Sequence, residues 1–302
     1  VELFPVGVNG YSAAVRGGGV VHHGGLMGFA RFADLDDAKI YQSLWRKTTS
    51  LTAVANYWYD DSMLAGTPPA NFYASAPLEA ATLDYRDGIR HWLPGSHSEH
   101  LLESMVFGGA GTLEAPAQFL LADYLLYYPF IDGDSADAQD FDNTVTLPRF
   151  TDGVGVRMFL AVQGTGGGNG AYSISYTNQD GVSGRTATGS VPVPGGSGMV
   201  LTSGGGGSNT RAPFIGLQSG DTGVRSVEQF TWTVQPGGIS ALVLCKPLAQ
   251  FNYLEIGTAA ERVFFPRFPA IHGEAFLGLL RCASLATPNA RTYTGLLTTI
   301  RS

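Results

Sequence analysis

The chain has 302 residues, of which 44% are hydrophobic and 14% charged, and its formal net charge is −7. This apolar content is enough for a large core and excludes wholesale disorder, and the lack of a G-X-Y period excludes a collagen-like triple helix. No basic tract is present to neutralise phosphates, which argues against a nucleic-acid-binding protein.

Charge is divided unevenly along the sequence. Residues 1–152 carry 8 basic and 19 acidic side chains, whereas residues 153–302 carry 10 basic and 6 acidic ones. Most of the cations are arginines, which suit bidentate pairing at interfaces better than lysines do. The two halves could attract each other within one molecule or between copies, and a solvated acidic face is an equally good interpretation.

Residues 1–144 are predicted to form a mixed α+β region that begins with a Gly-punctuated, β-prone arm over 1–27. Apolar side chains then recur at helical spacing behind aspartates that could cap a helix, which predicts a helix over Asp36–Leu51. A second helix is predicted over Pro116–Tyr128, where Pro129 would end it.

Two further segments of this region are predicted to lack long elements: the first is expected to be an ordered loop or short strands, and the second a loop. Asn56–Pro77 is polar, aromatic and rich in proline, and Asp132–Asp142 is acidic. The first loop carries the aromatic residues Tyr57, Trp58, Tyr59, Phe72 and Tyr73. These rings could stack on sugars or fill a protein interface, and the low content of charged residues favours the interface.

From residue 145 the pattern changes to alternating, β-branched runs, so 145–302 is predicted to be an antiparallel β-sandwich or jelly-roll-like domain. The expected strands are Val156–Val162, Ala171–Thr177, Ser226–Val234 and Ser240–Leu248. Gly-rich connections separate them, and the dipeptide Asp180-Gly181 is a strong hairpin-turn signal. The whole fold is therefore expected to be mainly β.

Three arginines complete the candidate interface: Arg149, Arg211 and Arg225. Arg149 is expected to offer its guanidinium fork to the acidic loop, and Arg225 could reach Asp221 or Asp152 across a turn. Hydrogen bonds and ion pairs within ordinary turns of one molecule are an equally good interpretation of these contacts.

The sequence does not match the common motifs for catalysis and metal binding. No Gly-Lys dipeptide is present for a phosphate-binding loop, and the G-x-S-x-G of serine hydrolases is missing. His97, His100 and Glu103 would share one helix face, but an exposed polar helix start is the simpler interpretation. The acidic loop does not fit an EF-hand, although a looser cation site there is an alternative. We expect no catalytic residues, no cofactor and no metal.

The two cysteines, Cys245 and Cys282, lie in apolar runs and are expected to be buried free thiols, with a single disulfide as the alternative. The apolar runs fall short of the roughly 20 residues that a membrane span needs. No signal segment opens the chain. These features predict a protein that folds in a reducing cytoplasm and has no membrane contact.

Five long strings of the sequence are distinctive. They are LLADYLLYYPFID (Leu120–Asp132), DNTVTLPRFTDGVGVRMFLAVQ (Asp142–Gln163), SYTNQDGVSGRT (Ser175–Thr186), PFIGLQSGDTGVRSVE (Pro213–Glu228) and ALVLCKPL (Ala241–Leu248). Together they resemble a family of proteins encoded in or near the virion structural modules of tailed bacteriophages. The resemblance covers about Asn56–Ser302 and carries no catalytic residues.

The resemblance implies a non-enzymatic virion protein of the head-decoration or minor capsid type, assembled in the host cytoplasm. Such a cement protein would self-associate, as a trimer, and bind the lattice of the phage major capsid protein. A tail or baseplate component is the alternative within the virion. A glycan-binding module that uses the aromatic loop is the alternative outside this class.

Overall fold

The computed structural model describes residues 39–48, 54–92, 99–108, 117–166, 168–191, 196–201, 213–254, 259–264, 267–283 and 292–301. Within these ranges the chain is almost entirely β, with two short 3₁₀ helices, η1 (Asp61–Met63) and η2 (Tyr85–Asp87). All strand pairings in the sheets are antiparallel, and the described strands form three sheets. The expectation of a mainly β protein is confirmed.

The described strands form a first, a central and a third sheet. The first sheet has the strand order β13 (Ala259–Val263), β5 (Glu99–Gly108), β16 (Thr292–Arg301), β1 (Lys39–Thr48) and β3 (Ala65–Thr67), and β14 (Ala270–Ile271) pairs with β5. The central sheet has the order β2 (Trp58–Asp60), β15 (Phe276–Ala283), β6 (Ala117–Asp132), β12 (Ile239–Tyr253) and β8 (Arg157–Gly164), and β4 (Ala81–Thr82) pairs with β6. The third sheet has the order β10 (Arg185–Val191), β9 (Gly170–Asn178), β11 (Val224–Val234) and β7 (Gln139–Asp140).

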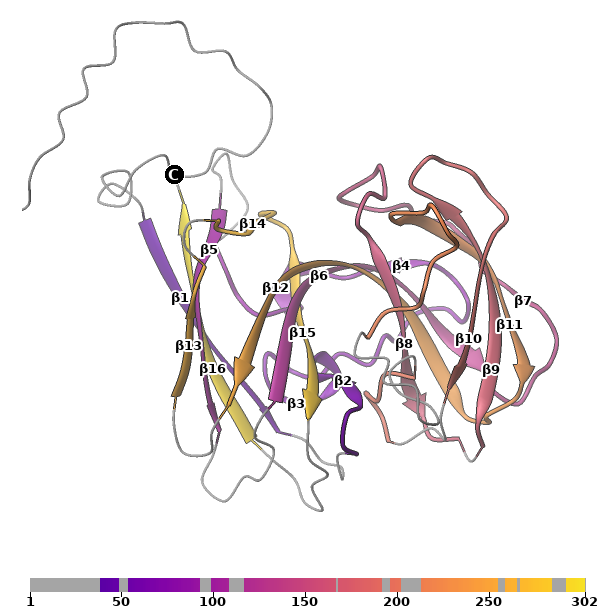
Figure 1. Cartoon of the computed structure of the whole chain (residues 1–302), viewed down its shortest axis with the longest axis horizontal. Coiled ribbons are helices and arrows are strands. Elements are labelled where there is room, and N and C mark those ends of the chain that lie inside the picture. The colour runs from indigo at the N-terminus through magenta and orange to yellow at the C-terminus, as the bar shows by residue number, and fades with distance from the viewer. Residues whose placement is uncertain are drawn as a thin grey trace, which may run out of the picture.

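The long strands β6 and β12 arch from one lobe of the molecule to the other (Figure 1). At one end they pack with β15 against the first sheet, around Trp45, Phe119 and Leu297. At the other end they pack with β8 against the third sheet, around Leu160 and Trp232. The molecule is therefore two sandwiches that share one central sheet.

A third core lies on the opposite face of the central sheet. Side chains of that sheet, such as Tyr124 and Phe159, are covered there by Trp58, Met63 and Tyr73. The middle of β6 is consequently buried on both faces, from Leu121 to Pro129. Such a strand reads as a continuous apolar run, without the alternation that marks a half-exposed strand.

Both predicted helices are wrong where the structure describes them. Residues 39–48 of the helix expected over Asp36–Leu51 form β1, and the ends of that range lie outside the described residues. Its apolar spacing was compatible with a helix, but in the strand the neighbours Leu44 and Trp45 point to opposite faces. Pairing with β16 and β3 decides the outcome.

The helix expected over Pro116–Tyr128 is the first part of β6, apart from Pro116, which lies outside the described residues. Burial on both faces removed the period-2 signal, and the aromatic residues happened to recur at helical spacing. Pro129 does not end the element. It lies at a bulge opposite Ala241, beside Phe130 with φ 60°, where a missing N–H donor is tolerated. The mixed α+β N-terminal region is thus not observed in the described residues.

The four strands predicted after residue 145 are confirmed as β8, β9, β11 and β12, each with slightly different bounds. The Asp180-Gly181 hairpin is confirmed as well, because Gly181 has φ 76° and its N–H donates to the carbonyl of Asn178 at 3.0 Å. However, β1 pairs with β16 and β6 pairs with β12. The sheets therefore do not separate at residue 144, because each of these pairs joins the ranges 1–144 and 145–302.

Two further observations concern the cysteines and the possible membrane-spanning helices. Cys245 and Cys282 are free thiols, the first buried and the second half-buried. In the part of the chain that the structure describes, no helix has the length and apolar character needed to cross a bilayer.

Gly295 provides a test of this packing. A Cβ at this position would lie 2.2 Å from the buried Trp45 indole, so we expect Gly295→Ala to lower the free energy of unfolding by about 1–3 kcal/mol. Urea unfolding measures this change. Gly216→Ala is the matched control, since a Cβ there meets nothing within 4 Å. Equal effects of the two substitutions would contradict the assigned packing.

Candidate functional site

The aromatic residues proposed as an interface are mostly inside the molecule. Trp58, Tyr59 and Tyr73 are at most 5% exposed, and Tyr57 is half-buried. Phe72 is 56% exposed. Trp58 and Tyr73 belong to the third core, whereas Tyr59 and Tyr57 pack in the core against the third sheet, and of the five only Phe72 is a surface side chain.

A buried carboxylate explains why this polar, aromatic segment folds inward. Asp60 has no exposed area, and its carboxylate accepts hydrogen bonds from the Tyr73 hydroxyl, the Tyr124 hydroxyl at 3.0 Å and the Ser62 N–H at 3.0 Å. Burial raises the pKa of Asp60, whereas these hydrogen bonds lower it. The tyrosine hydroxyls therefore serve an internal network.

Lys47 attaches the same segment to the first sheet. Its Nζ donates to the backbone carbonyls of Leu64 and Pro68 at 3.1 and 2.8 Å, with longer contacts to Ser62 and Pro69. Burial lowers the pKa of Lys47 to about 8, while the charges of nearby aspartates oppose that change. The ammonium group donates to carbonyls of this turn that have few other hydrogen-bond donors, and so takes the place of water.

Arg281 also holds this segment on the central sheet, and no sequence pattern predicted its role. Its Nε lies 3.1 Å from both carboxylate oxygens of Asp61, and the two side chains are at most 1% exposed. The guanidinium also lies over the rings of Tyr59 and Tyr293, at 5.3 and 5.2 Å from their centroids. β15 delivers the arginine opposite β2, so only the strand pairing brings this ion pair together.

Arg149 does not reach the acidic loop, contrary to the sequence prediction. It forms a buried bidentate pair with Asp123, with Nε–Oδ2 and Nη2–Oδ1 distances of 2.8 and 2.6 Å. Burial raises the pKa of Asp123, and the arginine opposes that rise. The acidic loop instead orders itself, because the Asp132 carboxylate accepts from the Asp134 N–H and Gln139 bonds the backbone of Asp132.

The remaining predicted cations have separate positions. Arg225 donates to the backbone carbonyls of Asp152 and Gln179, so it does reach residue 152, but through the main chain. Asp221 pairs with Arg185 at 3.0 Å, and the hydrogen bond from Arg185 helps to lower the pKa of Asp221 to about 2. Arg211 lies outside the described residues. Of the three arginines, the two that the structure describes, Arg149 and Arg225, therefore have different partners.

The helix start expected around His100 and Glu103 is also wrong, because these residues lie on strand β5. His100 is buried and Glu103 is half-buried, and His97 lies outside the described residues. Among the described residues no group of three or more His, Cys, Asp or Glu side chains could hold a metal ion.

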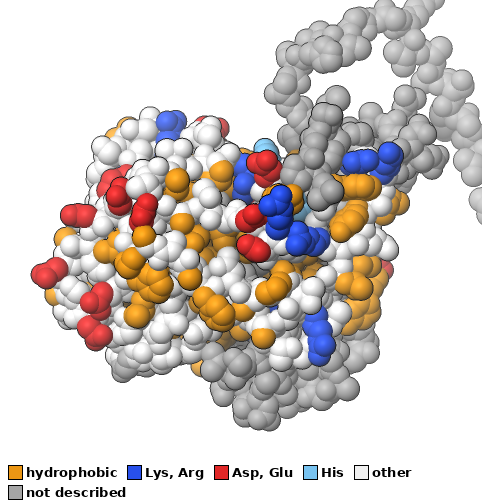
Figure 2. All heavy atoms as spheres, turned by 180° about the vertical axis from the view of Figure 1, so that it is seen from behind, with side chains coloured by type: hydrophobic (Ala, Val, Ile, Leu, Met, Phe, Trp, Pro, Cys, Tyr) orange, Lys and Arg blue, Asp and Glu red, His pale blue; other side chains and the backbone are white. Residues whose placement is uncertain are grey.

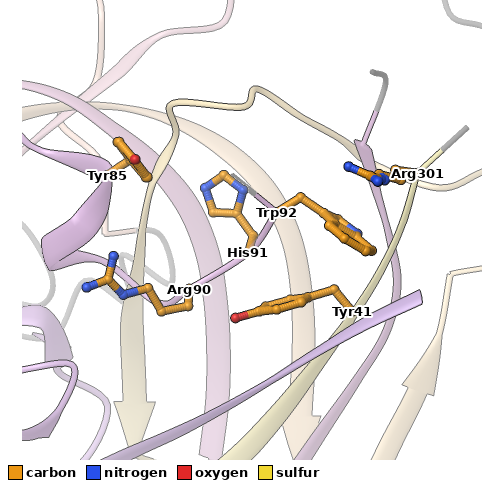
Figure 3. A pocket seen from close by; sticks show the side chains of 6 residues that line it. All are labelled: Tyr41, Tyr85, Arg90, His91, Trp92 and Arg301. Carbon is orange, nitrogen blue, oxygen red and sulfur yellow. The ribbon is translucent and has the colours of Figure 1, made fainter. Parts of the chain in front are cut away.

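One open pocket of about 540 Å³ lies where β1 and β16 of the first sheet meet η2 and the segment that follows it. It is lined by Tyr41, Tyr85, Arg90, His91, Trp92 and Arg301. Figure 3 shows the Trp92 indole between the Tyr41 ring and the Arg301 guanidinium, with Arg90 and Tyr85 at the other end. The Arg301 guanidinium is 4.1 Å from the Trp92 ring centroid, and the Tyr41 and Trp92 ring centroids are 5.4 Å apart.

A buried pair supports the floor of this pocket. His91 Nδ1 is 2.8 Å from Glu99, and His91 Nε2 is 2.9 Å from the carbonyl of Ala275. The other Glu99 oxygen accepts from the Trp92 N–H at 3.1 Å. The Glu99 carboxylate is thus engaged in holding the backbone, whereas two guanidinium groups line the pocket. The arrangement favours an anion with a flat or ring-shaped body.

The face of the molecule in Figure 2 carries acidic side chains over the lobe of the third sheet. A second acidic group lies near the middle, beside basic side chains that continue over the other lobe. The acidic loop 132–142 contributes to the first group because β7 pairs with β11. The fold therefore moves this acidic segment of the first half beside strands of the second half.

Comparisons with known proteins identify no family. No family model matches the chain, and no curated protein matches it. A solved structure of T=1 particles derived from infectious bursal virus matches with a TM-score of 0.20 and 9% identity, over 87% of this chain and 78% of that one. A VP2 subviral particle of infectious bursal disease virus gives 0.19 and 8%, over 87% and 81%. TM-scores of this size do not establish a shared fold.

The Asp123–Arg149 pair is open to a direct test. Arg149→Met leaves a buried carboxylate without its partner, so we expect the free energy of unfolding to fall by about 3–5 kcal/mol in urea titrations. Arg86→Met is the control, because Arg86 and Asp84 form a solvent-screened exposed pair at 3.6 Å, and its loss is expected to change the free energy of unfolding little. A similar small effect at both positions would show that the buried pair does not stabilise the fold.

Proposed function

We propose that this chain is a structural protein of a tailed-bacteriophage virion, and specifically a decoration or cement protein of the head. It acts by binding and has no enzymatic activity. Its partners are the phage major capsid protein and further copies of itself, and it joins the particle in the host cytoplasm. The strings that resemble proteins of phage structural modules are the sequence support for this class.

The observation that carries the proposal is the pair of strands shared by both sandwiches. β6 and β12 pair from Ala117–Tyr253 at one end to Asp132–Ile239 at the other, so hydrogen-bonded strands run from one lobe to the other. A force applied to one lobe passes into the other through backbone hydrogen bonds and two packed cores, with no flexible linker in between. A protein that holds neighbouring capsid subunits against internal pressure needs this kind of body.

The surface offers apolar contacts for such binding. Large exposed hydrophobic residues occur on both lobes, among them Leu44, Phe72, Val154 and Leu254. Few lysines surround them, which reduces the desolvation and side-chain entropy that a contact must overcome. Contacts of this kind suit a permanent assembly, in which each subunit contributes modest affinity and the lattice multiplies it.

Purified virions of the phage that encodes the chain provide the test. Quantitative mass spectrometry is expected to find the chain in many copies, in a fixed ratio to the major capsid protein. A virion without the chain is expected to lose its genome at a lower temperature. Absence of the chain from the particle would refute the proposal, and a copy number of only a few would move the protein to the tail or baseplate.

The pocket supports a second candidate, the binding of an acidic saccharide. The glycan-binding alternative from the sequence relied on Trp58 and Tyr59, which are buried. The pocket instead supplies the guanidinium of Arg90 for a carboxylate or sulfate, and the Trp92 indole, which Tyr41 and Arg301 hold in place, as an apolar wall. Such a site would let a virion protein attach to a cell-surface glycan.

An array of acidic oligosaccharides, followed by titration calorimetry with any hit, tests the second candidate. Trp92→Ala and Arg90→Ala are each expected to weaken binding at least about tenfold, equivalent to ~1.4 kcal/mol. Phe72→Ala is the control because it removes an exposed ring away from the pocket. The candidate is rejected if no acidic glycan binds, or if the pocket variants bind as well as the unmodified chain.

A further inference from the structure

The outer face of the first sheet carries a group of apolar side chains among polar ones, although its inner face already supplies a core. On three neighbouring strands Leu44 pairs with Leu296, and Leu296 pairs with Met105. These side chains point away from the core, because their neighbours Trp45 and Val106 point into it. A strand that is apolar on both faces is typical of a sheet that is covered on both sides.

Exposure values show how much of this face meets solvent. Leu44 is 67% exposed, Ile40 58%, Val263 52% and Phe107 39%, whereas Met105 is half-buried. They come from β1, β5 and β13, so they span the sheet on both sides of β16. Hydrophobic side chains are also visible along the margin of this lobe in Figure 2, on its right. A group of exposed apolar side chains on three strands of one sheet differs from the single apolar residues that ordinary surfaces carry.

Charged side chains on the same face have opposite signs on the two sides of β16. Arg46 is exposed on β1, two residues from Leu44. Glu261 on β13 lies opposite Met105 in the ladder. Glu103 on β5 is two residues from Met105 and faces the same side of the sheet. Partial burial and the charge of Glu261 raise the pKa of Glu103. One side of the face therefore carries a cation, the other side carries two crowded carboxylates, and leucine and methionine lie between them.

We infer that the outer face of the first sheet is a two-fold contact between two copies of this chain. A two-fold axis that runs along β16, in the plane of contact, places the β1 side of one copy over the β5–β13 side of the other. Leu296 then meets its own counterpart, and Leu44 meets Met105. Arg46 lies opposite Phe107 and near Glu261. An isologous contact requires this kind of self-complementary surface.

The size of the face approaches that of a standard contact, although Thr298 and Ile300 at one end of β16 are already buried within this chain. Three strands of ten residues, at ~4.8 Å between strands and ~3.3 Å per residue, outline roughly 500 Å². β3 and β13 extend this area toward the ~800 Å² per partner of a standard specific interface. The contact goes beyond the proposed virion function and does not depend on it, and its two-fold symmetry differs from the trimer that the resemblance implies.

Charge reversal of the full-length chain tests the pairing. Sedimentation equilibrium is expected to give a dimer for the unmodified chain. Arg46→Glu and Glu261→Arg each bring like charges together in the homodimer, so each variant is expected to dissociate at least about tenfold more readily. An equimolar mixture of the two variants restores opposite charges at both contacts and is expected to dimerise again. Val182→Glu, an exposed apolar position in the hairpin of the third sheet, should leave the dimer intact.

A cysteine on the axis gives a second measurement that does not depend on charge. In Leu296→Cys the two new thiols would face each other, so mild oxidation with diamide is expected to form a disulfide-linked dimer. Val182→Cys and the unmodified chain should stay uncrosslinked under the same conditions.

Several results would overturn the inference. A monomer or trimer for the unmodified chain, charge variants that dimerise unchanged, or a mixture that stays dissociated would each do so. If Leu296→Cys crosslinked no better than Val182→Cys, the axis would be wrong. Circular dichroism of every variant establishes that it is folded. Copy number in the virion, which tests the proposed function, is a separate measurement and does not decide this one.

Discussion

The pairing of β6 with β12 is the constraint on which the other features depend. Both strands are long, and each contributes to all three hydrophobic cores. A strand covered on both faces has no water to satisfy its peptide groups, so its neighbours must supply every hydrogen bond. That requirement holds β15 and β8 on either side of the pair, and it fixes the two outer sheets relative to each other.

Buried charges lie where loops meet this central sheet. Asp123 with Arg149 and Asp61 with Arg281 each connect a segment outside the sheet to one of its strands, and Lys47 binds the turn after η1. Ion pairs of this kind add little net stability compared with apolar side chains of the same size, because desolvation offsets the attraction. Their effect is to give one placement of each loop a much lower free energy than other placements, in which the charges would be buried without partners.

The two-fold contact and the proposed place in a virion follow from the same property. Each sandwich needs only one face of each sheet for its core, so an apolar outer face adds nothing to the stability of a single chain. Its exposure to water has a cost that contact with another protein removes. The first sheet has such a face, and the rigid connection through β6 and β12 leaves the other lobe available for a different partner.

Sequence patterns predicted β9, whose side chains alternate between buried and half-buried, and β11, although bulges interrupt its alternation. They also predicted the Asp180-Gly181 hairpin, which requires a positive φ at the glycine. In β1 strand pairing overrides the local spacing, and in β6 burial on both faces does so. Tertiary contacts likewise determine the partners of Arg149 and Arg281 and the inward placement of Trp58, Tyr59 and Tyr73. Long-range contacts bring these groups together across large separations in the chain, and no short-range pattern records which residues will meet.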